Sequence, residues 1–182
     1  MATKFSKETD GRLGELFLYI ARKCEQQKHL GTVKLNKLMF LADTLAYARH
    51  GRSLTGAEYT KEAQGPCPVR SSEVRKNLVK SKAALVQPTK EGDRLTALRD
   101  ANLGLYSNEQ IAVVNQVLSD FSANTGTELS SFSHKFEGWK LANTGEKIPF
   151  ATVFIPTKAV RLTRGQQEWA RQMVLTMGGT PN

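Results

Sequence analysis

The sequence predicts an α+β fold, in which one mostly helical domain carries a small antiparallel β-sheet or hairpin. Apolar residues recur at helical spacing along most of the chain, and two short strand-like runs flank a turn at residues 88–93. The 182 residues, 40% of them hydrophobic and 24% charged, suit one globular unit with a packed core. We therefore expect a single domain over residues 1–177 and a disordered tail at 178–182.

Two helices are predicted in the first 51 residues. The first starts near Asp10, and its apolar face is formed by Leu13, Leu16, Phe17, Ile20, Ala21 and Cys24. The second starts at Thr32, which suits an N-cap, and ends at Gly51. Because the second helix is apolar on most faces, it should lie at the centre of the core.

The middle of the chain changes pattern. Residues 58–64 suit a short strand, and the Gly65-Pro66-Cys67-Pro68 turn should continue neither a strand nor a helix. A basic helix is expected over residues 69–82, anchored by Val74 and Leu78. Strands at 83–87 and 94–98 follow, joined by a turn at 88–93.

Further helices are predicted in the last 76 residues. Ser107 and Gln110 form a capping box at the start of one helix, whose core face is Ile111, Val114, Leu118 and Phe121. A short helix with Leu129, Phe132, Ser133 and Phe136 in register comes next, followed by an extended apolar run at 150–155. The last helix is capped by Thr163 with Gln166 and should bury Trp169, Met173 and Met177.

The composition argues against a disulfide-rich secreted protein and against a metal or cofactor site, but it does not identify the binding partner. The two cysteines do not form a disulfide framework, and the polar N-terminus has no signal-peptide core, so we expect a cytoplasmic protein without a membrane partner. No spacing of histidine, cysteine or carboxylate indicates a metal, and no glycine pattern indicates a cofactor. The net charge of +9 favours polyanions or acidic protein surfaces without choosing between them.

Three motifs occur in an order and spacing that resemble those of the SocA-like Panacea domain. They are Lys34-Leu35-Asn36-Lys37-Leu38-Met39-Phe40-Leu41-Ala42-Asp43, then His50-Gly51-Arg52-Ser53-Leu54-Thr55-Gly56-Ala57-Glu58-Tyr59 with Gly65-Pro66-Cys67-Pro68, and last Leu129-Ser130 to His134 with Gly138-Trp139-Lys140. The resemblance covers roughly residues 13–150. The chain departs from it at Cys67, where the family usually has an aliphatic residue, and at 62–64, which lack an aromatic residue.

The resemblance implies an antitoxin that binds another protein. Members of this family stand beside many small toxins and in prophage genes, and the founding member delivers its toxin to a protease. The partner of this chain is then a cognate toxin, and a protease is a further partner if the toxin is delivered for degradation. The family-motif positions expected to be structural are Lys34, Leu35, Lys37, Leu38, Asp43, Gly51, Thr55, Tyr59, His134 and Trp139.

The expected partner-binding surface is the rigid turn with the basic helix behind it. Its candidate residues are Gly65, Pro66, Pro68, Arg70, Arg75, Lys76 and Lys80. A basic helix followed by a hairpin is also the layout of a winged helix that binds DNA, and this is the alternative function, although we favour a protein partner.

No catalytic site is expected. Asp43 should be a buried acid bonded to the backbone of the Gly-Pro turn or to Arg52, and His134 should pack near Trp139. A hydrolase that uses His134, Glu137 or Asp43 has the least support, because no nucleophile or metal motif accompanies them.

Overall fold

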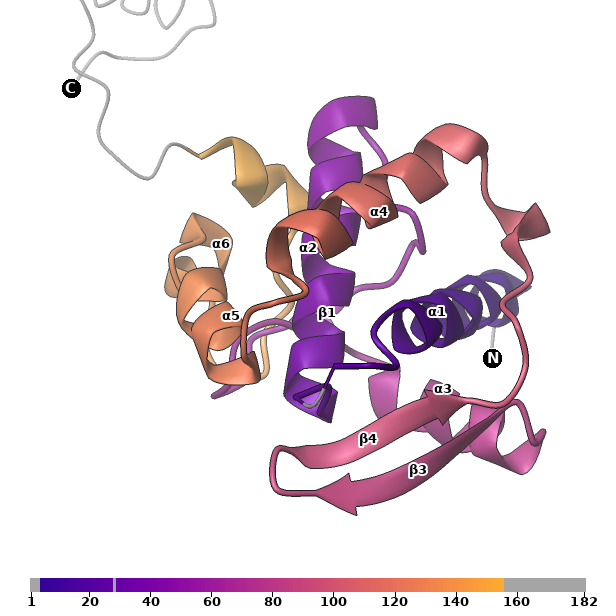
Figure 1. Cartoon of the computed structure of the whole chain (residues 1–182). Helices are drawn as coiled ribbons and strands as arrows, with labels where there is room; N and C mark the ends of the chain where they lie inside the picture. The colour runs from indigo at the N-terminus through magenta and orange to yellow at the C-terminus, as the bar shows by residue number, and fades with distance from the viewer. Residues whose placement is uncertain (1–3, 28, 156–182) are drawn as a thin grey trace, which may run out of the picture.

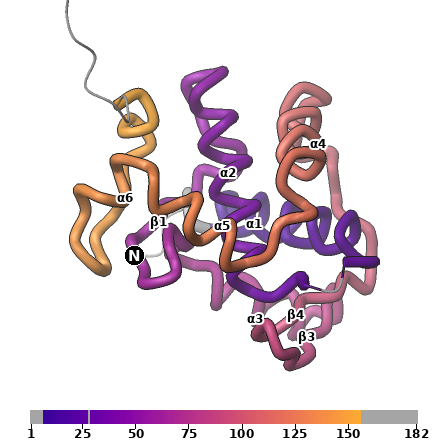
Figure 2. Tube along the Cα trace, turned by 60° about the vertical axis from the view of Figure 1, so that its left-hand side comes forward, coloured from indigo at the N-terminus to yellow at the C-terminus, as the bar shows by residue number. Residues whose placement is uncertain are grey.

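The computed structural model of the chain describes residues 4–27 and 29–155, and it confirms the α+β expectation. Within these residues the elements, in chain order, are α1 (Lys4–Lys23), α2 (Thr32–His50), β1 (Tyr59–Thr60), β2 (Cys67–Pro68), α3 (Ser71–Lys80), β3 (Ala84–Thr89), β4 (Gly92–Ala97), η1 (Leu103–Leu105), α4 (Asn108–Phe121), α5 (Gly126–Ser133), α6 (Glu137–Leu141) and η2 (Phe150–Phe154). Figure 1 shows α2 in the middle, with α4 crossing it. In both views the hairpin β3–β4 and α3 lie at the opposite end of the molecule from η2 (Figure 2).

The central place of α2 is confirmed by its burial. Every residue from Lys34 to Thr44 is buried, which a helix apolar on most faces requires. Gly51 ends the helix in the left-handed conformation, with φ +69°, as expected. The expected N-cap is wrong, because Thr32 is the first helical residue and its hydroxyl donates to the Asp93 carbonyl of the hairpin at 2.8 Å instead.

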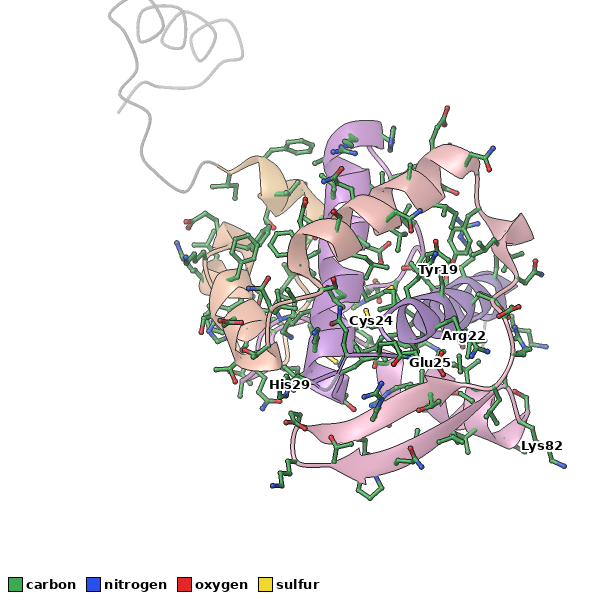
Figure 3. The ribbon with its side chains drawn as sticks, in the orientation of Figure 1. Tyr19, Arg22, Cys24, Glu25, His29 and Lys82 are labelled. Atoms are coloured by element: carbon green, nitrogen blue, oxygen red, sulfur yellow. The ribbon has the colours of Figure 1, made fainter. Side chains whose placement is uncertain are left out.

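The first helix is longer than expected. It begins at Lys4 and not near Asp10, because its first two turns carry no apolar stripe that the sequence pattern could reveal. Its expected apolar face is confirmed, since Leu13, Leu16 and Ile20 are fully buried. Cys24 lies between the end of α1 and α2, as part of the core (Figure 3).

The hairpin is tighter than predicted. Pro88 pairs with Asp93 and Thr89 with Gly92, so the strands run on into the expected six-residue turn and leave only Lys90 and Glu91 between them. Similarly, the Gly-Pro turn does continue an element, because Cys67 and Pro68 form β2 and pair with Thr60 and Tyr59 of β1. Helix α3 is shorter than the expected 69–82 at both ends.

The C-terminal half follows the prediction in part. The short helix is present as α5, but it ends at Ser133, so Phe136 lies outside it and precedes α6, which was not predicted. The Ser107–Gln110 capping box is present, and α4 buries Val113, Val114, Val117 and Leu118, whereas Ile111 and Phe121 are only half-buried. The predicted extended run at 150–155 is wrong. It forms η2, in which the Pro149 carbonyl accepts hydrogen bonds from the amide and hydroxyl of Thr152, at 3.0 and 2.6 Å.

The predicted last helix, capped by Thr163, and the predicted tail at 178–182 lie outside the described residues. In the part of the chain that the structure describes, no helix has both the length and the apolar character that crossing a bilayer requires.

Candidate partner-binding surface

Helix α3 is fixed against α2 by polar side chains. Asn36 of α2 accepts a hydrogen bond from the Ser71 hydroxyl at 2.7 Å, and its amide donates to the Cys67 sulfur at 3.3 Å. One turn further along α3, the Arg75 guanidinium donates to Thr32 Oγ1 at 2.7 Å. Because Ser71 and Asn36 are buried, these bonds hold the start of α3 in one position on the core.

Two of the predicted binding residues, Arg70 and Arg75, instead connect α3 to neighbouring helices through hydrogen bonds. Arg70 forms two hydrogen bonds of 2.7 Å to the Asp10 carboxylate of α1. Arg75 is half-buried and is occupied by Thr32 and by the Ser71 carbonyl. Sequence reasoning placed both on a free basic face. That expectation fails because a guanidinium can reach back over its own helix to polar groups on neighbouring helices.

The Gly-Pro turn is buried, contrary to the expectation of an exposed, rigid docking element. Gly65, Pro66 and Pro68 are all buried, and the turn packs between α2 and α5. At Gly65, φ is +97°, and an added Cβ would lie 2.3 Å from Ser133 Oγ and 2.7 Å from Lys37 Cε. Only glycine fits this backbone and this space. The turn therefore organises the core and offers little surface to a partner.

Lys37 lies beneath the same turn. Its ammonium group is buried and donates to the Pro66 carbonyl at 2.6 Å. Burial lowers the pKa of Lys37 from 10.5 to about 8, while the nearby Cys67 and Glu62 act in the opposite direction. Between these two pKa values the unfolded chain binds more protons than the folded one, so the contribution of Lys37 to stability rises with pH there.

This titration predicts a specific pH dependence. Between pH 8 and 10.5, the stability of the parent protein should rise relative to that of Lys37→Met, and below pH 8 the difference should be constant. Urea unfolding of both proteins at several pH values measures it. Lys76→Met, at an exposed lysine of α3, is the control. A stability difference between the parent and Lys37→Met that does not change with pH would show that Lys37 is not desolvated.

Asp43 is a further buried charged residue of α2, after Lys34 and Lys37, and it holds the loop after this helix. Its carboxylate accepts hydrogen bonds from Leu54 N (2.8 Å), Thr55 N (2.9 Å), Thr55 Oγ1 (2.5 Å) and Tyr59 Oη (2.8 Å). Burial raises the pKa of Asp43, and these hydrogen bonds oppose the rise. The buried, structural character was expected, but the partners were not, since the carboxylate bonds neither the Gly-Pro turn nor Arg52.

The other family-motif residues also occupy structural positions. Lys34 ties α2 to the end of α4, donating to the Ser122 carbonyl at 2.6 Å and to Gln27 Oε1 at 2.8 Å, and Leu35 and Leu38 are in the core. His134 stacks on Trp139 with ring centroids 3.8 Å apart, as predicted. Glu137 forms an ion pair with Lys140 at 2.7 Å.

Several structural residues were missed by sequence reasoning. Asn36, Ser71 and Asp10 each fix one of the contacts above, yet each is a polar residue outside the apolar periodic patterns. Their partners are distant in the chain, so local patterns carry no information on them.

The exposed face of α3 remains as the surface that a partner can reach. Lys76, Val79 and Lys80 are exposed there at helical spacing, and Val79 is 41% exposed although apolar. Lys82 follows the helix and points away from the body of the molecule (Figure 3). Within the described residues, no carboxylate lies within 4.0 Å of any of these three lysines. We name the surface formed by Lys76, Val79, Lys80 and Lys82 the α3 face.

No group of three or more histidine, cysteine or carboxylate side chains in residues 4–27 and 29–155 could hold a metal ion. Burial, followed by the charges of Lys37 and Lys61, lowers the pKa of His134.

The family comparison gives one match. A family model described as the antitoxin SocA-like, Panacea domain matches residues 35–140, which is more than half of the chain. The matched range includes most of α2, with Lys37 and Asp43, and it also includes the buried turn, α3 and the His134–Trp139 stack. No curated protein and no solved structure matches the chain.

Proposed function

Because the chain belongs to the family of antitoxins with a SocA-like Panacea domain, we propose that it neutralises a small toxin protein by binding it directly. The match over residues 35–140 is the observation that carries this proposal. Neutralisation by delivery to a protease is the second form that the family suggests. The two differ in outcome, because delivery lowers the amount of toxin in the cell and direct binding does not.

The proposal places the toxin on the α3 face. This face combines lysines without ion-pair partners among the described residues with an exposed apolar side chain, and the tethers to α1 and α2 hold it rigid. A rigid surface loses little conformational entropy on docking. Its positive charge would steer an acidic toxin surface and raise the association rate more than the final affinity.

Co-expression with the product of the neighbouring gene tests the function. That product should arrest growth when expressed alone, and growth should resume when this protein is expressed with it. The two proteins should copurify, and the toxin level should be unchanged if binding is direct. A neighbouring product that is harmless, or that never copurifies, contradicts the proposal.

Charge reversal tests the surface. Lys76→Glu/Lys80→Glu should slow association with the toxin about tenfold or more at low salt, and the difference should shrink at high salt. Thermal melting should hardly change, because both residues are exposed. Lys135→Glu, at an exposed lysine between α5 and α6 that also has no ion-pair partner among the described residues, is the control. An unchanged association rate for the α3 variant would exclude the α3 face as the interface.

Binding to DNA is the second candidate function. The observation that favours it is the layout, since α3 with its free lysines is followed directly by the hairpin β3–β4, with Lys90 at the tip. A steep fall of duplex DNA affinity with salt, lost in Lys76→Glu/Lys80→Glu, would support this function in place of toxin binding.

Neutralisation should need no catalysis by this chain. His134 is the residue best suited to acid–base chemistry, and it is stacked on Trp139. A folded His134→Ala variant should therefore still rescue growth. Intact toxin binding without rescue would indicate an enzymatic antitoxin.

A further inference from the structure

An apolar groove of about 340 Å³ lies between α2 and α4. One face of α2 forms its floor with Leu41, Leu45 and Ala48, and the rings of Phe121, Phe132 and Phe136 form its walls. The groove lies far from the α3 face, near the end of the molecule where η2 is found (Figures 1 and 2). The described residues leave this face of α2 partly open, since Leu45 is half-buried and Ala48 is exposed.

One polar atom in the groove also lacks a partner. Thr44 is 5% exposed, it lines the groove, and its hydroxyl oxygen has no hydrogen-bond partner among the described residues. A buried hydroxyl without a partner costs about 1–3 kcal/mol. This cost indicates that the described residues do not complete the surroundings of α2.

The chain itself leads to this groove. Val153 of η2 lines the groove, and the described residues end two positions later at Ile155. Phe154 and Ile155 are 62% and 41% exposed, so apolar surface continues beyond the groove in the direction of the remaining chain. Another 27 residues follow, since the chain has 182.

Those residues contain a sequence suited to an apolar groove. At helical spacing, Trp169, Met173 and Met177 share one face of residues 163–177 with Ala170 and Val174, while Arg164, Gln167 and Arg171 share the other. A helix of this length is only marginally stable alone in water, so it needs an apolar surface to pack against. The seven residues from 156 to 162 can span roughly 23–25 Å, which is ample to reach a groove lined by Val153.

We propose that this groove binds the chain's own C-terminal segment, residues 163–177, as an amphipathic helix. The segment covers the open face of α2 and buries Trp169 and Met173 among the phenylalanine rings. Covalent attachment gives it a local concentration of the order of millimolar, which an independent helix from another protein would have to exceed. The groove is therefore filled within one chain and is not the toxin site.

Tryptophan fluorescence of the full-length protein tests this docking. The chain has two tryptophans, so Trp139→Phe leaves Trp169 as the only indole and keeps a ring against His134. In this background Trp169 should emit at shorter wavelength than free tryptophan amide and be quenched several-fold less by acrylamide. Emission and quenching equal to those of tryptophan amide would overturn the proposal.

Two further variants locate the docking. Ala48→Glu places a charge in the groove at an exposed residue, and Met173→Glu places one on the segment, so each should expose Trp169. Ala112→Glu, at an exposed alanine of α4 outside the groove, is the matched control and should change nothing. If Trp169 stays buried in both Ala48→Glu and Met173→Glu, it docks elsewhere and the proposal is wrong.

Dilution separates docking within one chain from exchange between two. Burial of Trp169 that is lost at low protein concentration, together with a dimer in sedimentation, would assign the groove to the segment of a second copy and overturn the proposal. The test needs no toxin, so its outcome is separate from that of the toxin-binding experiments.

Discussion

An Asp43→Ala variant is expected to lose at least about 3 kcal/mol of unfolding free energy. The substitution leaves the amides of Leu54 and Thr55 and the hydroxyl of Tyr59 without their acceptor, and all three residues are buried. Each orphaned buried donor costs about 1–3 kcal/mol, so a small domain can lose much of its stability. Urea unfolding measures the loss.

Two other substitutions make this prediction specific. Asp43→Asn keeps the size and one acceptor oxygen, so it should lose less than Asp43→Ala. Asp100→Ala, at a side chain that is 93% exposed, should change stability by less than about 0.5 kcal/mol. If Asp43→Asn unfolds like the parent yet no longer neutralises the toxin, Asp43 belongs to a functional surface and its structural role is wrong.

The second large effect is expected at Gly65. Gly65→Ala should cost about 2–5 kcal/mol, from the strain of a non-glycine residue at φ +97° and from the overlap of Cβ with Ser133 and Lys37. Thermal melting of the variant measures it. Adding Ser133→Ala should recover part of the loss, because it removes the atom 2.3 Å from that Cβ.

Gly145→Ala is the control that separates strain from overlap. Gly145 also has a positive φ, +82°, but an added Cβ there has nothing within 4 Å. Gly145→Ala should therefore lose only the stability that the backbone strain costs. Equal losses at Gly65 and Gly145 would mean that the turn can move aside, and that it does not fix the contact between α2 and α5.

The parts of the fold that the sequence predicted are those set by local patterns. The central helix, the Ser107–Gln110 capping box, the glycine after α2 and the hairpin each depend on residues close together in the chain. The segment 150–155 was predicted wrongly because its apolar residues suit a strand as well as a 3-10 helix. Hydrogen bonds of Thr152 to the Pro149 carbonyl decide between them.

The candidate surface was only partly predictable, because side-chain contacts between distant residues decide which charges are free. Arg70 and Arg75 look like Lys76 and Lys80 in the sequence, but Asp10 and Thr32 occupy them from other helices. The Gly-Pro turn was expected at the exposed binding surface, whereas Lys37 and Ser133 enclose it. The sequence pattern alone contains no sign of either contact.

Hydrogen–deuterium exchange of the protein with and without its toxin tests the central claim most directly. The account predicts slower exchange of backbone amides in residues 71–82 of the complex, and unchanged exchange in α6 and η2 at the other end of the molecule. Protection confined to α6, η2 or the groove between α2 and α4, with residues 71–82 unchanged, would contradict it.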